Sequence, residues 1–227
     1  GMILFTSRPV GDAMATTIWG ASSSWTLTAL PLFVWMGEIL FRTKLSENLF
    51  KGLAPWLQKL PGGLIHVNVV GCALFAAISG SSAATVATVG KMSIPELRKR
   101  KYPEKILLGS LAGSGTLGLL IPPSIILIIY GVTVQESIAK LFIAGIIPGI
   151  MIALIFMSYV IVWSLINKKN MPKLIENSSF LEKVKKSRQL MPVVLLILGV
   201  IGSIYTGVAT ATEAASLGVV GALILSY

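Results

Sequence analysis

The groups that could do chemistry in this sequence lie in two breaks within long apolar runs. The first break is Ser79-Gly80-Ser81-Ser82, in the middle of the run 64–90, and the second is 113–124, within the run 106–130. Serine hydroxyls and backbone carbonyls freed at a helix break are oxygen ligands that suit Na⁺, and freed N–H groups suit a carboxylate. A proline kink with structural glycines would account for either break alone. Two breaks in successive apolar runs favour a binding site.

The second break is expected to free carbonyls because Pro122 and Pro123 have no N–H to donate. An interior proline costs a helix about 3 kcal/mol, and the carbonyls about one turn earlier lose their partners. We expect these carbonyls near Leu117 to Leu119. A discontinuous helix facing a serine-rich turn would then build a cation site from two segments.

Other reactive side chains are scarce. The chain has one cysteine, Cys72, and one histidine, His66, so we expect no internal disulfide, no cysteine metal site and no histidine triad. Glu38 is interpreted as an acid near the membrane interface, with a coupling carboxylate as the alternative, and Glu213 as a residue that favours the start of the last helix. No titratable groups cluster at membrane depth. The sequence therefore predicts no enzyme, no cofactor and no metal other than Na⁺.

The composition defines the setting of these breaks. Of the 227 residues, 54% are hydrophobic and 12% are charged, and the mean hydropathy is +0.82, whereas soluble domains carry about 25% charged residues. The 19 Lys and Arg give a net charge of +10 but lie mostly in three loops between apolar runs. This distribution is the positive-inside pattern rather than a nucleic-acid-binding stripe. We therefore predict an all-α polytopic membrane protein that binds membrane lipid and no nucleic acid.

The chain divides into apolar runs, one amphipathic stretch and basic loops. Residues 42–60 repeat leucine at helical spacing with charges between, which predicts a helix lying in the membrane interface, with an ordinary loop helix as the alternative. Residues 8–12 and 206–213 read as turns, and 91–105 and 167–190 as basic loops. The runs expected to form membrane helices or hairpins are 25–41, 64–90, 106–130, 141–166, 191–205 and 214–227.

Charge counting decides how the run 64–90 sits in the membrane. If it crosses once, 13 of the 18 loop cations lie inside the cell, but if it enters and returns on one side, 17 of the 18 do. The second arrangement fits the positive-inside rule better. It makes Ser79–Ser82 the tip of a re-entrant hairpin, whose arms of about 13 residues reach only part-way through a hydrocarbon core of about 30 Å.

Both ends of the sequence read as internal. Gly1 precedes Met2, and the last apolar run, 214–227, is shorter than the roughly 20 residues that a spanning helix needs. We expect this chain to be a fragment of a longer protein.

Four stretches of the sequence resemble the large membrane subunit of the tripartite ATP-independent periplasmic (TRAP) transporters. They are 31–38 (PLFVWMGE), 79–85 (SGSSAAT), 115–124 (GTLGLLIPPS) and 141–149 (LFIAGIIPG), with a weaker fifth at 210–215. The resemblance runs from about Leu30 to the end. His66 and Asn68 depart from it, because the family is mostly small and apolar there.

The resemblance implies an elevator-type secondary transporter of the bacterial inner membrane, with inverted repeats, a re-entrant hairpin (64–90) and a broken helix (106–130). Residues 1–60 would hold scaffold helices and an arm helix, 61–140 half of the transport domain, and 141–227 a connecting helix, a basic cytoplasmic loop and the start of the second repeat. The second hairpin and the second Na⁺ site would lie beyond Tyr227.

The implied function is Na⁺-coupled import of organic acids, such as C4-dicarboxylates or sialic acid. A periplasmic binding protein would deliver the substrate, and a small membrane subunit would complete the permease. An ion-coupled carboxylate transporter that needs no binding protein is the alternative. The resemblance assigns Na⁺ to Ser79, Ser81, Ser82, Gly118, Ile121 and Pro123, and substrate to Ser82, Thr85 and Thr116.

Overall fold

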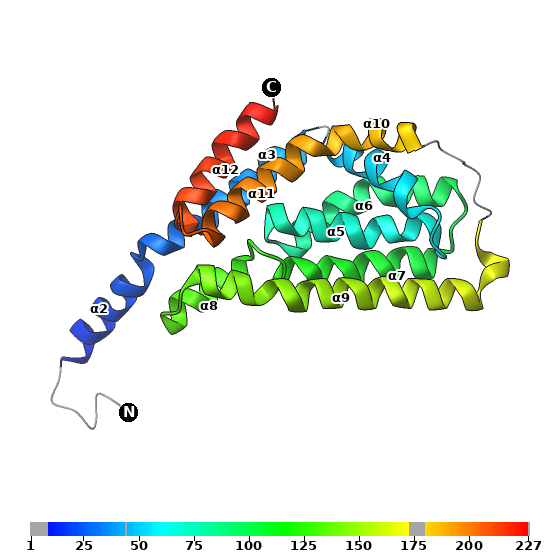
Figure 1. The fold of residues 1–227 in the computed structure, drawn as a ribbon. Coiled ribbons are helices and arrows are strands. Elements are labelled where there is room, and N and C mark those ends of the chain that lie inside the picture. Colours follow the sequence, from blue (N-terminus) through cyan, green and yellow to red (C-terminus); the bar gives the residue numbers. More distant parts are fainter. Residues whose placement is uncertain (1–8, 44, 173–179, 227) are drawn as a thin grey trace.

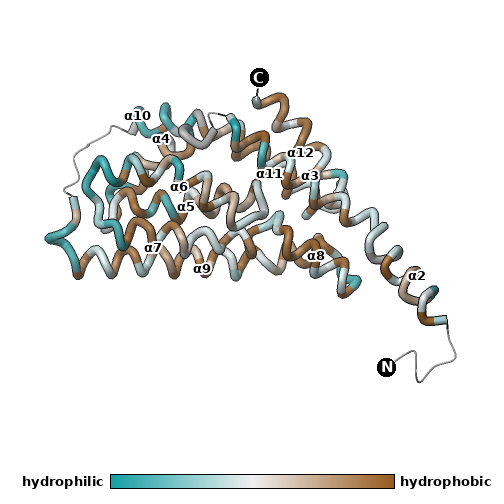
Figure 2. The backbone as a smooth tube through the Cα atoms, turned by 180° about the vertical axis from the view of Figure 1, so that it is seen from behind, coloured by the Kyte–Doolittle hydropathy of each residue, from teal (hydrophilic) through white to brown (hydrophobic). Residues whose placement is uncertain are grey.

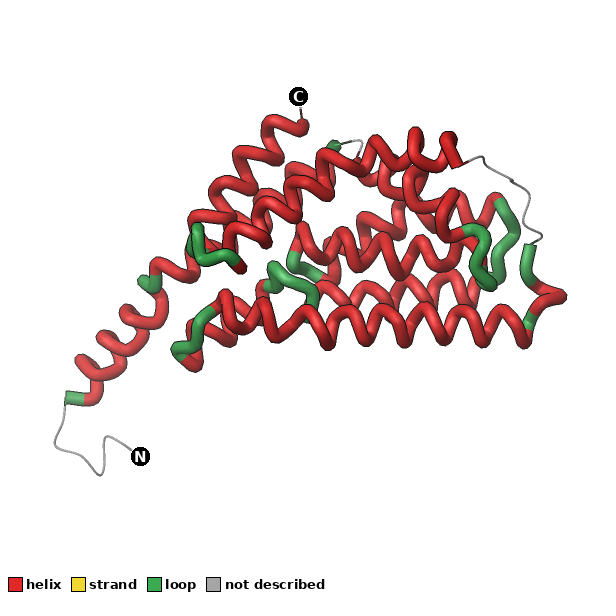
Figure 3. Tube along the Cα trace, in the orientation of Figure 1, coloured by secondary structure: helices red, strands yellow, loops and turns green. Residues whose placement is uncertain are grey.

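The chain is entirely helical in the part that its structure describes. This computed structural model covers residues 9–43, 45–172 and 180–226, and throughout these ranges helices are joined by turns with no strand. Figure 1 shows a layered bundle from which α2 extends at the N-terminal side, and Figure 3 shows how short the connecting turns are. The prediction of an all-helical fold is confirmed.

A helical hairpin occupies the middle of the bundle. Helices α5 (His66–Ser79) and α6 (Ser82–Lys99) run antiparallel and pack against each other (Figure 1). Gly80 ends α5 in the left-handed conformation with φ 58°, which glycine adopts without strain. Ser81 is extended and caps α6, because its hydroxyl accepts a 3.4 Å hydrogen bond from the N–H of Ala84. The turn lies where the sequence predicts it, and its re-entry into a bilayer remains a prediction.

Helix α6 is longer than the sequence analysis expected. The predicted loop 91–105 is wrong for most of its length, because α6 continues to Lys99 and the next helix begins at Glu104. Val89, Ser93 and Leu97 are spaced by four residues and are all buried, so one face of α6 continues into the bundle despite the charges between.

Three other predicted turns or loops also contain helix. Of the turn 8–12, Arg8 lies outside the described residues, while Gly11 and Asp12 form the first turn of α2 (Val10–Ser22). The loop 167–190 contains α10 (Phe180–Ser187), and the turn 206–213 ends early because α12 begins at Ala211. At that start Thr210 and Glu213 cap each other through bonds of 2.8 and 3.3 Å, which confirms the role predicted for Glu213.

The predicted broken helix is confirmed as two helices with an irregular link. Helix α7 (Glu104–Gly115) continues as a 3₁₀ turn over Thr116–Leu119, the chain then leaves helical geometry, and α8 begins at Ile125. Ser124 caps α8 (Ile125–Val134) by accepting from the N–H of Leu127. The break therefore lies between two short helices of 12 and 10 residues.

Helix α9 (Ile138–Ile166) runs alongside the hairpin and the broken helix, so contacts along α9 show how far each of them extends through the bundle. Its Gly145 and Gly149 pack against the break of the neighbouring helix, at Leu120 and Ile121. Nearer its C-terminal end, α9 contacts Gly62, which precedes the hairpin. About 15 residues of α9, or roughly 22 Å, separate these levels. The hairpin therefore reaches along about half of a helix that is roughly 43 Å long.

The remaining helices pack on the other side of the hairpin, in the upper part of Figure 1. Helix α3 packs closely against α12, and it also contacts α5. At the contact with α5, a Cβ on Gly37 would lie 2.9 Å from the Cα of Ser79, so the absence of a side chain at Gly37 permits the contact. The bounds of this group are α3 Ala29–Arg42, α4 Leu45–Leu57, α11 Met191–Tyr205 and α12 Ala211–Ser226.

Apolar surface dominates the bundle, and polar surface gathers at one end. Among the described residues, α9 is the single straight helix long and apolar enough to cross a membrane, and a bent pair at 10–42 passes the same test. Figure 2 shows hydrophilic segments where α6 ends, where α9 ends and along α10. Three of the four basic segments counted in the sequence therefore lie toward one end, and Lys140 lies at the opposite end of α9.

Tyr102, which follows α6, is hydrogen-bonded to Leu64, which precedes α5, and so stabilises the open end of the hairpin. Its buried hydroxyl oxygen accepts a 3.1 Å hydrogen bond from the N–H of Leu64, and burial raises the pKa of the Tyr102 hydroxyl. The turn is closed further by Arg98, which holds Glu104 through bonds of 2.6 and 3.1 Å and lowers the pKa of that carboxyl.

We expect Tyr102→Phe to lower the free energy of unfolding by about 1–3 kcal/mol, because it leaves the buried N–H of Leu64 without a partner. Urea unfolding of the full-length protein in mild detergent measures this change. Tyr159→Phe is the matched control, since Tyr159 is exposed on α9. Equal stability of the two variants would contradict the role given to Tyr102.

Candidate functional site

The hairpin turn and the broken helix meet through their main chains. The N–H of Ile125 donates a 3.3 Å hydrogen bond to the carbonyl of Gly80, so the start of α8 is tied to the turn between α5 and α6. At the other side of the break, Gly118 lies against the backbone of Ser81 and Ser82. The two breaks singled out in the sequence therefore form one structural unit, as that analysis predicted.

Two glycines make this approach possible. A Cβ on Gly80 would lie 2.5 Å from the carbonyl oxygen of Pro123, and one on Gly118 would lie 2.9 Å from the nitrogen of Ser82. Real Cβ atoms do not come so close to backbone atoms. Any side chain at either position would push the broken helix away from the turn.

The serine hydroxyls of the turn differ in their hydrogen-bond partners. Ser79 and Thr85 share a buried 3.0 Å hydrogen bond, and Ser79 also contacts the main chain of Ser81 at 3.3 Å. The Ser81 hydroxyl caps α6. The hydroxyl oxygen of Ser82, in contrast, is buried and has no hydrogen-bond partner among the residues that the structure describes. Such a group is costly unless something else satisfies it, and a bound cation is one such partner.

The free carbonyls of the break lie later in the chain than the sequence analysis expected. The carbonyl of Leu117 accepts from the N–H groups of Leu120 and Ile121, and that of Leu119 accepts a 2.7 Å bond from the hydroxyl of Ser124. The expectation of free carbonyls at 117–119 is therefore wrong for these two. The tight 3₁₀ turn satisfies the first, and a buried serine satisfies the second.

Five other carbonyls of the break remain without donors. Among the described residues, no hydrogen bond reaches the carbonyl oxygen of Gly118, Leu120, Ile121, Pro122 or Pro123. Gly118, Ile121 and Pro123 carry the three backbone groups that the resemblance assigned to Na⁺. Together with the Ser82 hydroxyl they offer oxygen ligands and no negative charge. This donor set fits a small hard monovalent cation.

Two of the substrate residues that the resemblance implies, Thr85 and Thr116, differ in their exposure to solvent. Thr85 is buried within the hairpin, whereas Thr116 is exposed and donates a 2.7 Å bond to the carbonyl of Gly113. Close to both breaks, the N–H groups of Ser82 and Ala83 begin α6 and donate no hydrogen bond to described residues. A helix start with free N–H groups attracts anions.

Sequence reasoning missed two residues of this unit. Ser124 was quoted within a family stretch but given no role, although its buried hydroxyl holds the break and caps α8. Gly37 was likewise quoted without a role, and its contact with Ser79 becomes visible only in three dimensions. A serine directly after Pro-Pro was a signal for the first, because serine is a preferred helix cap.

Broken helices that meet inside an apolar bundle, with free carbonyls and free N–H groups at the junction, are typical of membrane transport proteins. The family can now be given. The chain belongs to the family described as "Tripartite ATP-independent periplasmic transporter, DctM component", which it matches over residues 2–227. This membership confirms the resemblance noted from the sequence.

Named relatives carry several different cargoes. The C4-dicarboxylate TRAP transporter large permease protein DctM of Pseudomonas aeruginosa is 35% identical over 96% of this chain and 50% of its own length. The sialic acid permease SiaM of Vibrio cholerae is 34% identical over 99% of this chain and 52% of its own. The ectoine/5-hydroxyectoine permease UehC of Ruegeria pomeroyi is 35% identical over 88% and 46%. The chain spans about half the length of the curated relatives it matches.

Proposed function

We propose that this chain provides one half of the binding centre of a Na⁺-coupled permease that imports organic acids. The observation that carries the proposal is the buried Ser82 hydroxyl, which has no partner among the described residues and lies beside a break whose carbonyls at Gly118, Ile121 and Pro123 are among five without donors. Transport requires binding and movement rather than bond making, and we assign no catalytic residue.

Sodium would be held by oxygen atoms of both breaks. The Ser82 hydroxyl and the carbonyls of Gly118, Ile121 and Pro123 are the available ligands, and Ser79 and Ser81 complete the turn that positions Ser82. A cation here would give the buried Ser82 hydroxyl the partner that it lacks among the described residues. It would also hold the turn and the broken helix together when substrate binds.

The cargo would bind at the start of α6. Its free N–H groups at Ser82 and Ala83 favour a negatively charged group. Thr85 lies in the first turn of α6, and Thr116 begins the 3₁₀ turn of the broken helix. The compounds in the relatives' names, C4-dicarboxylates, sialic acid and ectoine, each contain a carboxylate group. A shared acidic group is the simplest chemistry that one helix start can recognise.

The movement and the setting are part of the same proposal. The hairpin reaches along about half of α9, which supports re-entry from the basic end into an inner membrane that the complete permease crosses several times. Helices α3, α4, α11 and α12 would form or adjoin a scaffold past which the hairpin moves in an elevator cycle. A small membrane subunit and a periplasmic binding protein would complete the assembly.

The test is uptake into proteoliposomes that contain the full-length permease, its small subunit and its binding protein. We expect accumulation of a labelled dicarboxylate or sialic acid with an inward Na⁺ gradient and none with an equal K⁺ gradient. Uptake at the same rate under both gradients would contradict ion coupling. Uptake without the binding protein would instead favour the alternative, a carboxylate transporter that acts alone.

A further inference from the structure

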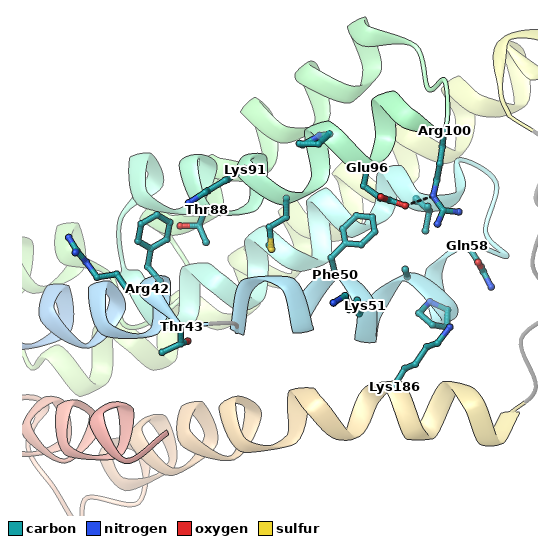
Figure 4. Close-up of a pocket in the computed structure, with 16 residues that line it drawn as sticks. Arg42, Thr43, Phe50, Lys51, Gln58, Thr88, Lys91, Glu96, Arg100 and Lys186 are labelled. Carbon is teal, nitrogen blue, oxygen red and sulfur yellow. Dashed lines mark hydrogen bonds and ion pairs between the residues drawn. The ribbon is translucent and has the colours of Figure 1, made fainter. Parts of the chain in front are cut away.

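A large cavity begins about one turn along α6 from the candidate transport site, where the amphipathic helix α4 faces α6 (Figure 4). Its volume is about 1230 Å³. Residues from the ends of α3 and α10 close its sides, so four helices contribute to it. Lys91 on α6 and Lys186 on α10 approach it from opposite sides of α4, as Figure 4 shows.

The cavity is strongly cationic. It is lined by one acid, Glu96, and by the five cations Arg42, Lys51, Lys91, Arg100 and Lys186. Glu96 pairs with Arg100 at 2.8 Å, and Glu38 pairs with Arg42 at 2.7 Å. Both pairs use only the Nε of the arginine, and the terminal nitrogens of Arg42 and Arg100 donate to no other described residue. Donors for an anion with several oxygens therefore remain after these ion pairs have formed.

The same cavity also has apolar walls. Phe41 and Phe50 contribute aromatic rings, and Lys91 lies 5.8 Å from the ring centre of Phe41. Leu64, Met92 and Pro95 are further apolar neighbours. A small hydrophilic anion would use the cations but leave these surfaces exposed to water. The volume also exceeds the roughly 300–1,000 Å³ typical of small-molecule sites.

The position of the cavity limits what can reach it. Helix α4 lies at the basic end of the bundle, where the hydrophilic segments gather in Figure 2. A basic end of an apolar helical bundle meets the headgroup layer of the cytoplasmic leaflet. A molecule that has an acidic head and apolar chains is abundant there and matches both kinds of wall.

We propose that this cavity binds an anionic phospholipid, with its acidic headgroup held by the cations that line the cavity and the first part of the chains against Phe41, Phe50 and Met92. The lipid would bridge α4 and α6, which are opposite walls of the cavity. This inference does not depend on the transport cycle, because it concerns binding alone.

The test is a lipid titration of the full-length permease in mild detergent, followed by native mass spectrometry. Phosphatidylglycerol and phosphatidylcholine of identical chains are compared. We expect phosphatidylglycerol to bind at least about tenfold more tightly, and the double variant Lys91→Gln, Lys186→Gln to lose about tenfold or more of that affinity while phosphatidylcholine binding is unchanged. Lys91→Arg with Lys186→Arg keeps both charges and should retain binding.

The control variant Lys105→Gln, Lys168→Gln removes the same charge from exposed lysines outside the cavity, and it should bind phosphatidylglycerol as the wild type does. Equal affinity for the two lipids would overturn the proposal, and so would an equal loss in the control variant. Competition by glycerol phosphate at the same concentration as the lipid would indicate a site for soluble anions instead. Unfolding temperatures of all variants verify that the fold is intact.

Discussion

Replacing Gly80 with alanine is expected to reduce Na⁺-driven uptake by about tenfold to a hundredfold. The new Cβ would require a left-handed conformation at φ 58° and would lie 2.5 Å from the carbonyl oxygen of Pro123 and 3.3 Å from the nitrogen of Ile125. The left-handed conformation strains an alanine whatever its neighbours, and the clash is relieved only if the broken helix moves away from the turn. That movement would separate Ser82 from the carbonyls proposed to share the ion.

Initial uptake rates at saturating Na⁺, in proteoliposomes with the complete assembly, measure this effect. Gly109→Ala is the matched control, because a Cβ at Gly109 in α7 meets nothing within 4 Å. That variant should transport normally and gain about 0.5–1 kcal/mol in stability from its higher helix propensity. Normal uptake by the Gly80 variant would show that the close approach of the two breaks is not required for transport.

Replacing Ser82 with alanine should raise the half-saturating Na⁺ concentration about tenfold without loss of stability, since an interaction with a charged group contributes about 1.5–3 kcal/mol. The buried Ser82 hydroxyl has no partner among the described residues, so its removal breaks no internal hydrogen bond. Deleting an unsatisfied buried hydroxyl is neutral or favourable to folding. If the Ser82 hydroxyl had a purely structural role, its removal would lower the stability and leave the half-saturating Na⁺ concentration unchanged.

The Na⁺ dependence of uptake and the unfolding temperature, measured on the same preparation, separate these outcomes. Ser203→Ala on α11 is the control, because its hydroxyl donates only to the local carbonyl of Val200. It should leave the Na⁺ dependence unchanged. Wild-type Na⁺ affinity in the Ser82 variant would remove this hydroxyl from the ion site.

Composition and charge predicted much of this fold because each is a sum over many residues. The turn at Gly80 was found because serine and glycine are poor choices inside an apolar helix, and the break before Ser124 because two prolines cannot donate. The length of α6 was missed because Val89, Ser93 and Leu97 continue a buried face that the charges between them conceal. The end of a helix depends on tertiary burial as much as on local composition.

The site was predictable in its parts but not in its internal hydrogen bonds. Sequence reasoning named the correct two breaks, yet it expected free carbonyls at Leu117 and Leu119, which are satisfied by a 3₁₀ turn and by Ser124. It could not distinguish Ser82 from Ser79 or Ser81, because only the fold decides which hydroxyl finds a partner. The role of Gly37 depends on a neighbour 42 positions away and has no local signal.

The hydrogen bond from the N–H of Ile125 to the carbonyl of Gly80 holds the two breaks together without using a side chain. It joins two main-chain groups, which every non-proline residue possesses, so neighbouring side chains other than those at Gly80 and Gly118 can be exchanged without breaking this hydrogen bond. Hydroxyls such as those of Ser82 and Thr85 can therefore diverge while the geometry persists. Permeases named for C4-dicarboxylates, sialic acid and ectoine can in this way inherit one architecture and differ in what it carries.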